Sequence, residues 1–293
     1  MDIPKFETLL LEVDGPVATI TLNRPEKLNS ISLTLREEFL RVLELLNPGD
    51  AIRVVRLKGA GRAFSTGYDL EGGYDVMSGQ TRLPVETEDE VSRIGESFIA
   101  QDRDNLRQVA VWLHRIRRFR KPIVAQVHGY CLAGGLDLIG VCDTVIAAED
   151  AQFGHPASRA LGLPTTIGLL PIKAGPLKTK EMLFTGDNIS GTEAQQWQII
   201  NRAVPADELD KQAMKYCRRI ALLPLDMLTV HKDVVNRWVD NMGYGPSVDT
   251  TTDLNTISHQ SPFTAEFIRK ATTESLKAAL DWRDGRFKRQ AEE

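Results

Sequence analysis

Twice along the chain, a short apolar stretch leads into a glycine-containing turn that is expected to open a helix. Residues 53–64 (RVVRLKGAGRAF) lead into 65–70 (STGYDL), and residues 121–131 (KPIVAQVHGYC) lead into 132–138 (LAGGLDL). Glycine lets a backbone approach a ligand closely, and a helix N-terminus leaves N–H groups without intrahelical acceptors. Two such turns that face each other would hold one oxyanion between two backbone donors. Turns that only pack strand-to-helix corners have the same spacing, so the spacing alone leaves both interpretations open.

Strands and helices alternate along most of the chain, and helices dominate its last third. The predicted elements are a hairpin around Asp14-Gly15, a helix over 33–46 with Ser32 before it, an exposed loop over 72–90 and an amphipathic helix over about 91–118. From about Pro171 the pattern is almost entirely helical. This order predicts an α/β core and a helical C-terminal part.

Composition argues against several classes of function. The 293 residues carry a net charge of −4, which argues against a general nucleic-acid-binding surface. Three widely spaced cysteines (Cys131, Cys142 and Cys217) indicate free thiols, and the spacings typical of metal sites are missing from the sequence. Because we find no targeting segment and no apolar run long enough to span a membrane, we expect a cytoplasmic protein.

Taken together, the motifs resemble the crotonase family, which is the enoyl-CoA hydratase/isomerase superfamily. The matching segments are 17–32, 59–70, 121–138, 151–156 and 185–205, and the resemblance covers roughly residues 10–290. It implies a spiral of repeated ββα units over 1–205 and a helical trimerisation region over 206–293. It also implies an acyl-CoA thioester as the substrate, with coenzyme A as part of that substrate and no separate cofactor or metal. A homotrimer, or a hexamer of paired trimers, is the assembly implied.

The resemblance assigns the two oxyanion donors to backbone N–H groups. One is that of Tyr68, which follows Gly67, and the other is that of Gly134 in the triplet Ala133-Gly134-Gly135. The Tyr68 side chain could line the acyl pocket. The further substrate-binding candidates are Lys27, Leu28, Ala63, Ser65, Gly67, Asp69, Leu70, Gly135, His155, Pro156 and Ala157.

Several of these candidates have a purely structural alternative. Lys27 could be a solvated charge at a turn after Pro25, or a flexible cation that contacts phosphate. Asp69 is expected to order its loop, and His155 to make a structural hydrogen bond, although its near-neutral pKa keeps it a candidate for proton transfer. The acidic residues at 86–90 are expected to be a solvated run of charge.

One acid stands where hydratases of this family have two. Asp137 lies at the position of the first glutamate, whereas the position of the second is Ala157, and residues 157–166 contain no carboxylate. Asp137 is therefore the candidate for a single general acid/base. Its structural alternatives are a helix cap or an ion pair with Arg159.

We therefore expect an enoyl-CoA hydratase-like enzyme that adds water reversibly to a 2-enoyl-CoA with Asp137 as the acid/base. The alternatives are a crotonase-fold thioester hydrolase, C–C lyase or isomerase, and a non-catalytic acyl-CoA-binding protein. Fold analogy does not decide among these reactions.

Overall fold

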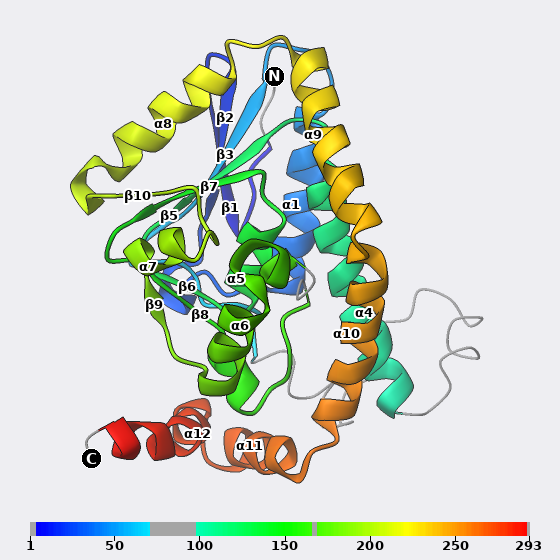
Figure 1. Ribbon diagram of the computed structural model, residues 1–293, viewed down its shortest axis with the longest axis vertical. Helices are drawn as coiled ribbons and strands as arrows, with labels where there is room; N and C mark the ends of the chain where they lie inside the picture. The colour runs from blue at the N-terminus through cyan, green and yellow to red at the C-terminus, as the bar shows by residue number, and fades with distance from the viewer. Residues whose placement is uncertain (1–3, 71–97, 166–168, 292–293) are drawn as a thin grey trace.

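The computed structural model describes residues 4–70, 98–165 and 169–291 (Figure 1). The predicted loop over 72–90, its acidic residues and the first residues of the helix predicted at 91–118 lie outside these ranges. The described part of that helix is α4, Phe98–Arg117.

Two sheets form the centre of the molecule. The larger has the order β1-β2-β3-β5-β7-β10, with the strands Leu9–Asp14, Val17–Leu22, Val54–Gly59, Ile123–Val127, Thr144–Ala148 and Arg202–Val204. The smaller has the order β4-β6-β8-β9, with the strands Ala63–Ser65, Tyr130–Leu132, Gln152–Gly154 and Ile189–Ser190. Pairing is parallel except for β1 with β2 and β8 with β9.

Successive strands alternate between the two sheets, and this alternation produces the ββ part of each repeat. β3, β5 and β7 lie in the larger sheet, and each is followed after a short corner by β4, β6 or β8 in the smaller one. The corner at Gly129 has a φ of +55°, and a Cβ there would lie 2.0 Å from the carbonyl oxygen of Arg62. Only glycine therefore fits where the second repeat passes the first.

Helices follow the strand pairs, and after β10 the chain is helical. The bounds of the further helices are α1 Leu33–Leu46, α5 Gly134–Gly140, α6 Leu169–Thr185, α7 Gly191–Gln196, α8 Leu209–Ile220, α9 Leu225–Asn241, α10 Tyr244–His259, α11 Pro262–Thr273 and α12 Leu276–Ala291. Short 3₁₀ turns occupy Pro25–Lys27, Pro156–Arg159 and Ala206–Glu208. The predicted hairpin and the helix at 33–46 are confirmed, and Ser32 Oγ accepts from Leu35 N at 3.2 Å as an N-cap.

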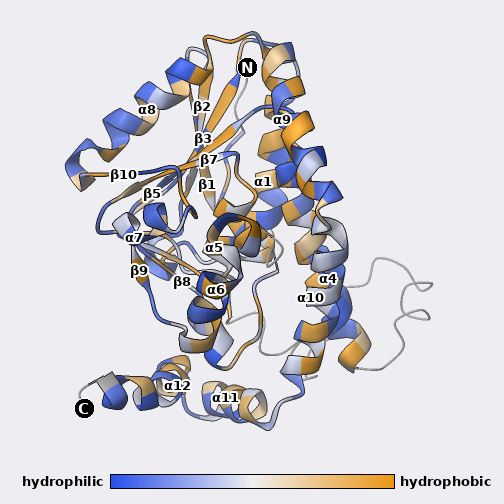
Figure 2. Ribbon diagram, in the orientation of Figure 1, coloured by the Kyte–Doolittle hydropathy of each residue, from blue (hydrophilic) through white to orange (hydrophobic). Residues whose placement is uncertain are grey.

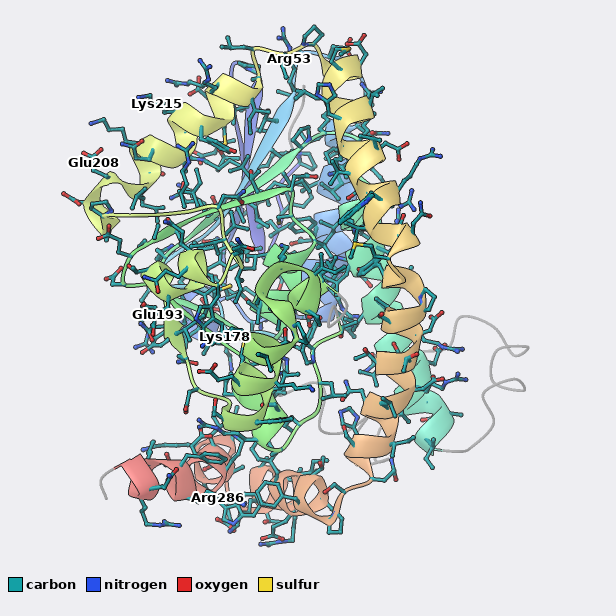
Figure 3. The ribbon with its side chains drawn as sticks, in the orientation of Figure 1. Arg53, Lys178, Glu193, Glu208, Lys215 and Arg286 are labelled. Atoms are coloured by element: carbon teal, nitrogen blue, oxygen red, sulfur yellow. The ribbon has the colours of Figure 1, made fainter. Side chains whose placement is uncertain are left out.

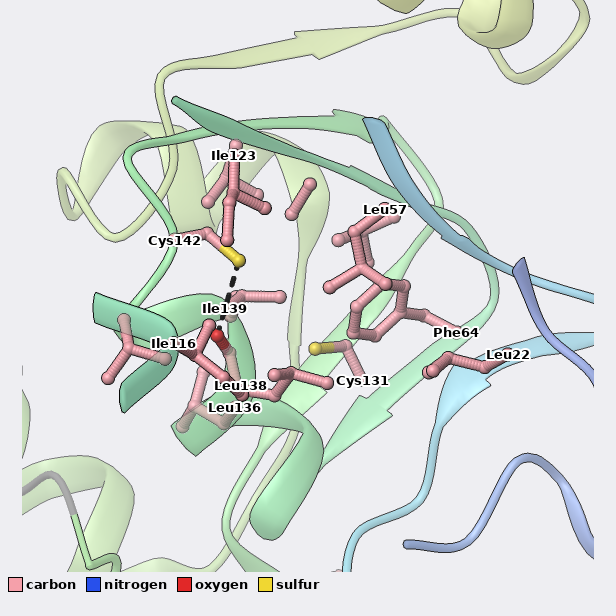
Figure 4. Close-up of a cluster of buried hydrophobic side chains, with 14 of the residues drawn as sticks. Leu22, Leu57, Phe64, Ile116, Ile123, Cys131, Leu136, Leu138, Ile139 and Cys142 are labelled. Carbon is pink, nitrogen blue, oxygen red and sulfur yellow. Dashed lines mark hydrogen bonds between the residues drawn. The ribbon is translucent and has the colours of Figure 1, made fainter. Parts of the chain in front are cut away.

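The core lies between the two sheets and α5. Leu57, Phe64 and Cys131 from the strands pack against Leu136 and Leu138 of α5 in one buried cluster (Figure 4). Cys142 Sγ contacts Leu138 O at 3.3 Å in this cluster. The three cysteines are free, as predicted, and they are buried. The strands are mostly apolar, whereas the outer helices mix both kinds of residue (Figure 2). Charged side chains such as Arg53, Lys215 and Glu208 point away from the core (Figure 3).

The C-terminal helices cover the core in different places. α8 packs on β3, β5 and β7, whereas α9 and α10 run one after the other along the side that carries α4 (Figure 1). Arg117 Nη1 pairs with Asp240 Oδ1 at 2.7 Å and Arg103 Nε with Asp253 Oδ1 at 2.6 Å, which ties α4 to both helices. Within the described ranges, we find no helix that is long and apolar enough to cross a membrane.

Candidate functional site

The first glycine turn follows β4 and is held by several hydrogen bonds. Gly67 has a φ of +102°, which L-residues rarely adopt. Its N–H donates to Ser65 Oγ at 3.2 Å, and its carbonyl oxygen accepts from Ile31 N at 2.8 Å. Asp69 N donates to Ile31 O at 3.1 Å, so Ile31 forms a parallel bridge with Tyr68. In this bridge the Tyr68 N–H points away from Ile31, and no acceptor in the described part of the chain takes its hydrogen bond.

The second glycine turn joins β6 to α5. Ala133 has φ +49° and ψ −117°, a conformation that costs a non-glycine residue on the order of 1–3 kcal/mol. It is held there because its N–H donates to Gly154 O at 3.0 Å and its carbonyl oxygen accepts from Leu136 N at 2.9 Å. Gly134 begins α5, so its N–H has no intrahelical acceptor. Each turn therefore leaves one backbone donor outside the regular pairing.

The two turns meet because their strands are parallel neighbours. β4 pairs with β6 through Ala63–Tyr130 and Ser65–Cys131, and the carboxyl ends of both strands lie at the same edge. A Cβ on Gly67 would lie 2.8 Å from Gly134 N, and a Cβ on Gly135 would lie 2.5 Å from Ser65 O. The two backbones therefore fit closely only with glycine at Gly67 and Gly135. This fit brings the turn that carries the Tyr68 N–H next to the turn that carries the Gly134 N–H.

Asp137 lies one turn into α5 and is buried, with 1% of its surface exposed. Its Oδ2 accepts from Tyr68 Oη at 3.2 Å and from Thr165 N at 3.2 Å. Such donors favour the ionised form of a buried carboxylate. Arg159, the alternative partner, forms ion pairs with Asp187 at 2.6 Å and Asp284 at 3.2 Å.

The Tyr68 ring lies directly against the start of α5. A Cβ on Gly134 would come within 2.7–2.9 Å of three atoms of the ring. Burial raises the pKa of the Tyr68 phenol well above its usual value of 10.0, and the charge of Asp137 raises it further. The phenol is therefore protonated at neutral pH and donates its hydrogen bond to the carboxylate.

The segment after β8 carries Ala157 on a 3₁₀ turn, Pro156–Arg159. The family resemblance matches this position to the second acid of hydratases. The Ala157 carbonyl oxygen accepts from Leu161 N at 2.6 Å, which leads the chain back toward Thr165. Pro156 is the first residue of the turn, and His155 before it is buried, with 3% of its surface exposed. His155 Nδ1 has no hydrogen-bond partner in the described ranges, so the structural hydrogen bond expected for this side chain is not made by that nitrogen.

We predict that His155 makes the fold sensitive to mild acid. Burial lowers the pKa of His155 from 6.5 to about 4, so the unfolded chain binds a proton that the folded chain does not between these values. The free energy of unfolding should therefore fall as the pH is lowered from about 6.5 to about 4, by up to about 3 kcal/mol from this group. Urea titrations at several pH values should show a shallower slope against pH in a His155→Leu variant. Parallel slopes in the two proteins would contradict the prediction.

The segments assigned to coenzyme A adjoin the first glycine turn. Leu28 O accepts from Thr66 N at 3.2 Å, and Lys27 before it is exposed. Arg24 Nη1 pairs with Asp69 Oδ2 at 2.8 Å, which ties the first glycine turn to the segment before Lys27.

Of the other predicted residues, Ala63 and Ser65 lie on the buried side of the first glycine turn. Ala63 and Ser65 are fully buried, and Ser65 Oγ donates to Asn29 O at 2.8 Å while Ala63 O accepts from Asn29 Nδ2 at 2.8 Å. The Ser65 hydroxyl and the Ala63 carbonyl group therefore stabilise the turn from inside. Leu70 is partly buried against the cluster of Ala160 and Phe267.

Sequence reasoning missed two contacts that define the site. The Tyr68 hydroxyl reaches Asp137 rather than only lining a pocket, and the Thr165 backbone contributes a donor to the same oxygen. The contact between Tyr68 and Asp137 had one sequence signal, which is that the tyrosine directly follows the glycine of the first turn. A backbone N–H carries no sequence signal, so the second could not have been found.

Comparisons with known proteins identify the family of the chain. Residues 12–284 match the family model described as enoyl-CoA hydratase/isomerase. The chain is 34% identical over 265 residues to EchA13 of Mycobacterium tuberculosis, named as a candidate enoyl-CoA hydratase, with 87% of this chain and 81% of that protein covered. It is 30% identical over 223 residues to the hydroxycinnamoyl-CoA hydratase-lyase of Pseudomonas fluorescens, with 74% and 73% covered.

Solved structures share the fold. A crystal structure of an enoyl-CoA hydratase from Mycobacterium smegmatis superposes with a TM-score of 0.84 at 31% identity, covering 96% of this chain and 94% of that chain. An enoyl-CoA hydratase/isomerase from Xanthobacter autotrophicus gives a TM-score of 0.83 at 29% identity, with 96% and 99% covered. The predicted α/β spiral is thereby confirmed.

Proposed function

The chain belongs to the enoyl-CoA hydratase/isomerase family, the crotonase superfamily, and we propose that it adds water reversibly to a 2-enoyl-CoA with Asp137 as its only carboxylate acid/base. One observation carries the proposal. Two glycine turns, each with a backbone donor outside the regular pairing, meet beside the buried carboxylate of Asp137.

The reaction assigns a task to each group. Tyr68 N–H and Gly134 N–H hold the thioester oxygen, where negative charge develops as water attacks the β-carbon. Asp137 takes the proton of that water, because a buried carboxylate within one hydrogen bond of the water can act as a general base. The coenzyme A part of the substrate binds next to Gly67, Leu28 and Lys27. No separate cofactor takes part in these steps.

Product analysis by mass spectrometry tests this function. Purified protein is incubated with a panel of 2-enoyl-CoA, 3-hydroxyacyl-CoA and 3-oxoacyl-CoA thioesters. We expect a gain of one water on a 2-enoyl-CoA. Free coenzyme A or a shortened acyl chain would contradict hydration and indicate hydrolysis or cleavage, and one relative is named as a hydratase-lyase. Binding without any product would contradict catalysis.

We also propose that the protein assembles as a homotrimer or a hexamer, through α9. Exposed apolar side chains recur on one face of this helix and just past its end, at Met227, Val230, Val234, Trp238 and Met242 (Figure 2). Their spacing of three or four residues makes a continuous apolar stripe, which a monomer rarely leaves in water.

The assembly is expected to depend on this stripe. A Val234→Asp, Trp238→Asp double variant should lower the mass measured by light scattering from that of three or six chains to that of one, because two buried charges would lack partners in the interface. Lys215→Glu, at an exposed position of α8, is the matched control and should leave the mass unchanged. A wild-type protein with the mass of one chain would contradict the proposal.

A further inference from the structure

The Tyr68 hydroxyl lies beside the Asp137 carboxylate. Its distance of 3.2 Å to Asp137 Oδ2 is long for an O–H···O hydrogen bond, so the hydroxyl can turn to a third atom at little cost. The ring cannot move away in the direction of α5, because Gly134 already lies in contact with it. The hydroxyl is therefore fixed in place, with a long hydrogen bond to Asp137 and the Thr165 side chain as a second hydrogen-bonding neighbour.

Tyr68 contributes two groups near the position of the thioester carbonyl, its backbone N–H and its side-chain hydroxyl. The Tyr68 N–H lies outside the Ile31 bridge, on the turn that meets Gly134, and the Tyr68 ring extends over Gly134 toward Asp137. A thioester oxygen held by the two N–H groups would place the adjacent α-carbon next to this side chain. Residues 157–165 contribute no carboxylate to that neighbourhood.

We propose that Tyr68 and Asp137 form a proton-transfer dyad, in which the Tyr68 hydroxyl delivers the proton to the α-carbon. This inference rests on the proposed hydration. It gives the second proton-transfer task to a phenol, in place of the acid that is missing at Ala157.

The protons balance over the cycle. Asp137 takes one proton from water as the water oxygen bonds to the β-carbon, and the electron pair of the double bond moves to the thioester oxygen. The enolate then collapses as the α-carbon takes the proton of the Tyr68 hydroxyl. The phenolate regains a proton from the protonated Asp137 across their shared hydrogen bond. One water has been added, and both residues return to their starting forms.

The charges of the site fit this order of steps. The Tyr68 phenol stays protonated before the reaction, because burial and the neighbouring carboxylate raise its pKa well above 10.0. A thioester enolate is a far stronger base than a carboxylate, so it can take a proton from such a weak acid. The Thr165 N–H remains on Asp137 Oδ2 throughout and keeps the carboxylate oriented.

The test separates proton transfer from positioning. Tyr68→Phe keeps the ring on Gly134 and the backbone N–H but removes the hydroxyl. We expect exchange of the α-proton of a saturated acyl-CoA in D₂O to slow by at least about 100-fold, with a KM within about threefold of that of the wild type. Asp137→Asn should slow the same exchange, because the phenol then has no base to receive its proton.

A second variant keeps the hydrogen bond and changes only the acidity. Replacing Tyr68 with 3,5-difluorotyrosine lowers the pKa of the phenol at nearly constant shape, so the rate and its pH profile should shift if this proton moves in the reaction. A Tyr68→Phe exchange rate within about threefold of that of the wild type, or a fluorinated protein with unchanged rates and pH profile, would overturn the dyad. Failure of the wild type to hydrate any enoyl-CoA would instead overturn the proposed function, because α-proton exchange does not require water addition.

Discussion

Asp137→Asn is expected to lower kcat for hydration by about 100- to 10,000-fold, which is the usual contribution of a general acid/base. Asparagine has nearly the same shape, and its amide oxygen can still accept from the Tyr68 hydroxyl and the Thr165 N–H. The substitution therefore removes proton transfer and the charge without opening a cavity. Because the residue is expected to act on the water and not on coenzyme A, the KM should change little.

Steady-state kinetics on one 2-enoyl-CoA checks this result, and thermal unfolding shows whether the variant folds. Asp150→Asn is the matched control, since Asp150 is exposed and follows β7 away from the glycine turns. It should leave both the rate and the melting temperature unchanged. An Asp137→Asn enzyme with more than about a tenth of the wild-type kcat would show that another group activates the water.

Gly67→Ala is expected to cost activity as well as stability. The new Cβ would lie 2.8 Å from Gly134 N and 2.9 Å from Ala133 Cβ, so the two turns must separate. Displacing one backbone donor from an oxyanion costs about 3 kcal/mol, or about 100- to 1,000-fold in kcat. The positive φ adds about 1–2 kcal/mol of strain to the folded state.

Gly243→Ala separates the two effects. Gly243 has a similar φ of +92°, but a Cβ there meets nothing within 4 Å. This variant should lose about the same 1–2 kcal/mol in a urea titration and keep its kcat. If Gly67→Ala lost no more activity than Gly243→Ala, the contact between the two turns would not position a catalytic donor.

Periodicity and turn chemistry predicted most of the fold. The Asp14-Gly15 hairpin and the helix after Ser32 carry local signals, since the turn pair and the cap act within a few residues. The distribution of strands between two sheets was implied by the family resemblance and not by any local pattern. It depends on corners such as Gly129, where one backbone touches another far away in sequence.

The candidate site divides in the same way. Gly67, Gly134 and Asp137 could be named as candidates from the sequence. The two glycines lie in turns after apolar stretches, and Asp137 is an acid within an apolar run. The contact between Tyr68 and Asp137 joins residues 69 positions apart, and the strain at Ala133 belongs to a residue with no special conformational preference. Such features arise from tertiary packing, which no local pattern reports.

Hydration in ¹⁸O-labelled water tests the central claim most directly. The wild-type protein is incubated with a 2-enoyl-CoA, and the position of the label is read by tandem mass spectrometry. Our proposal predicts one ¹⁸O on the β-carbon of an intact 3-hydroxyacyl-CoA, and predicts that Asp137→Asn slows its formation by at least about 100-fold. Label in a free carboxylic acid, together with free coenzyme A, would contradict hydration and place the attack of water on the thioester carbon.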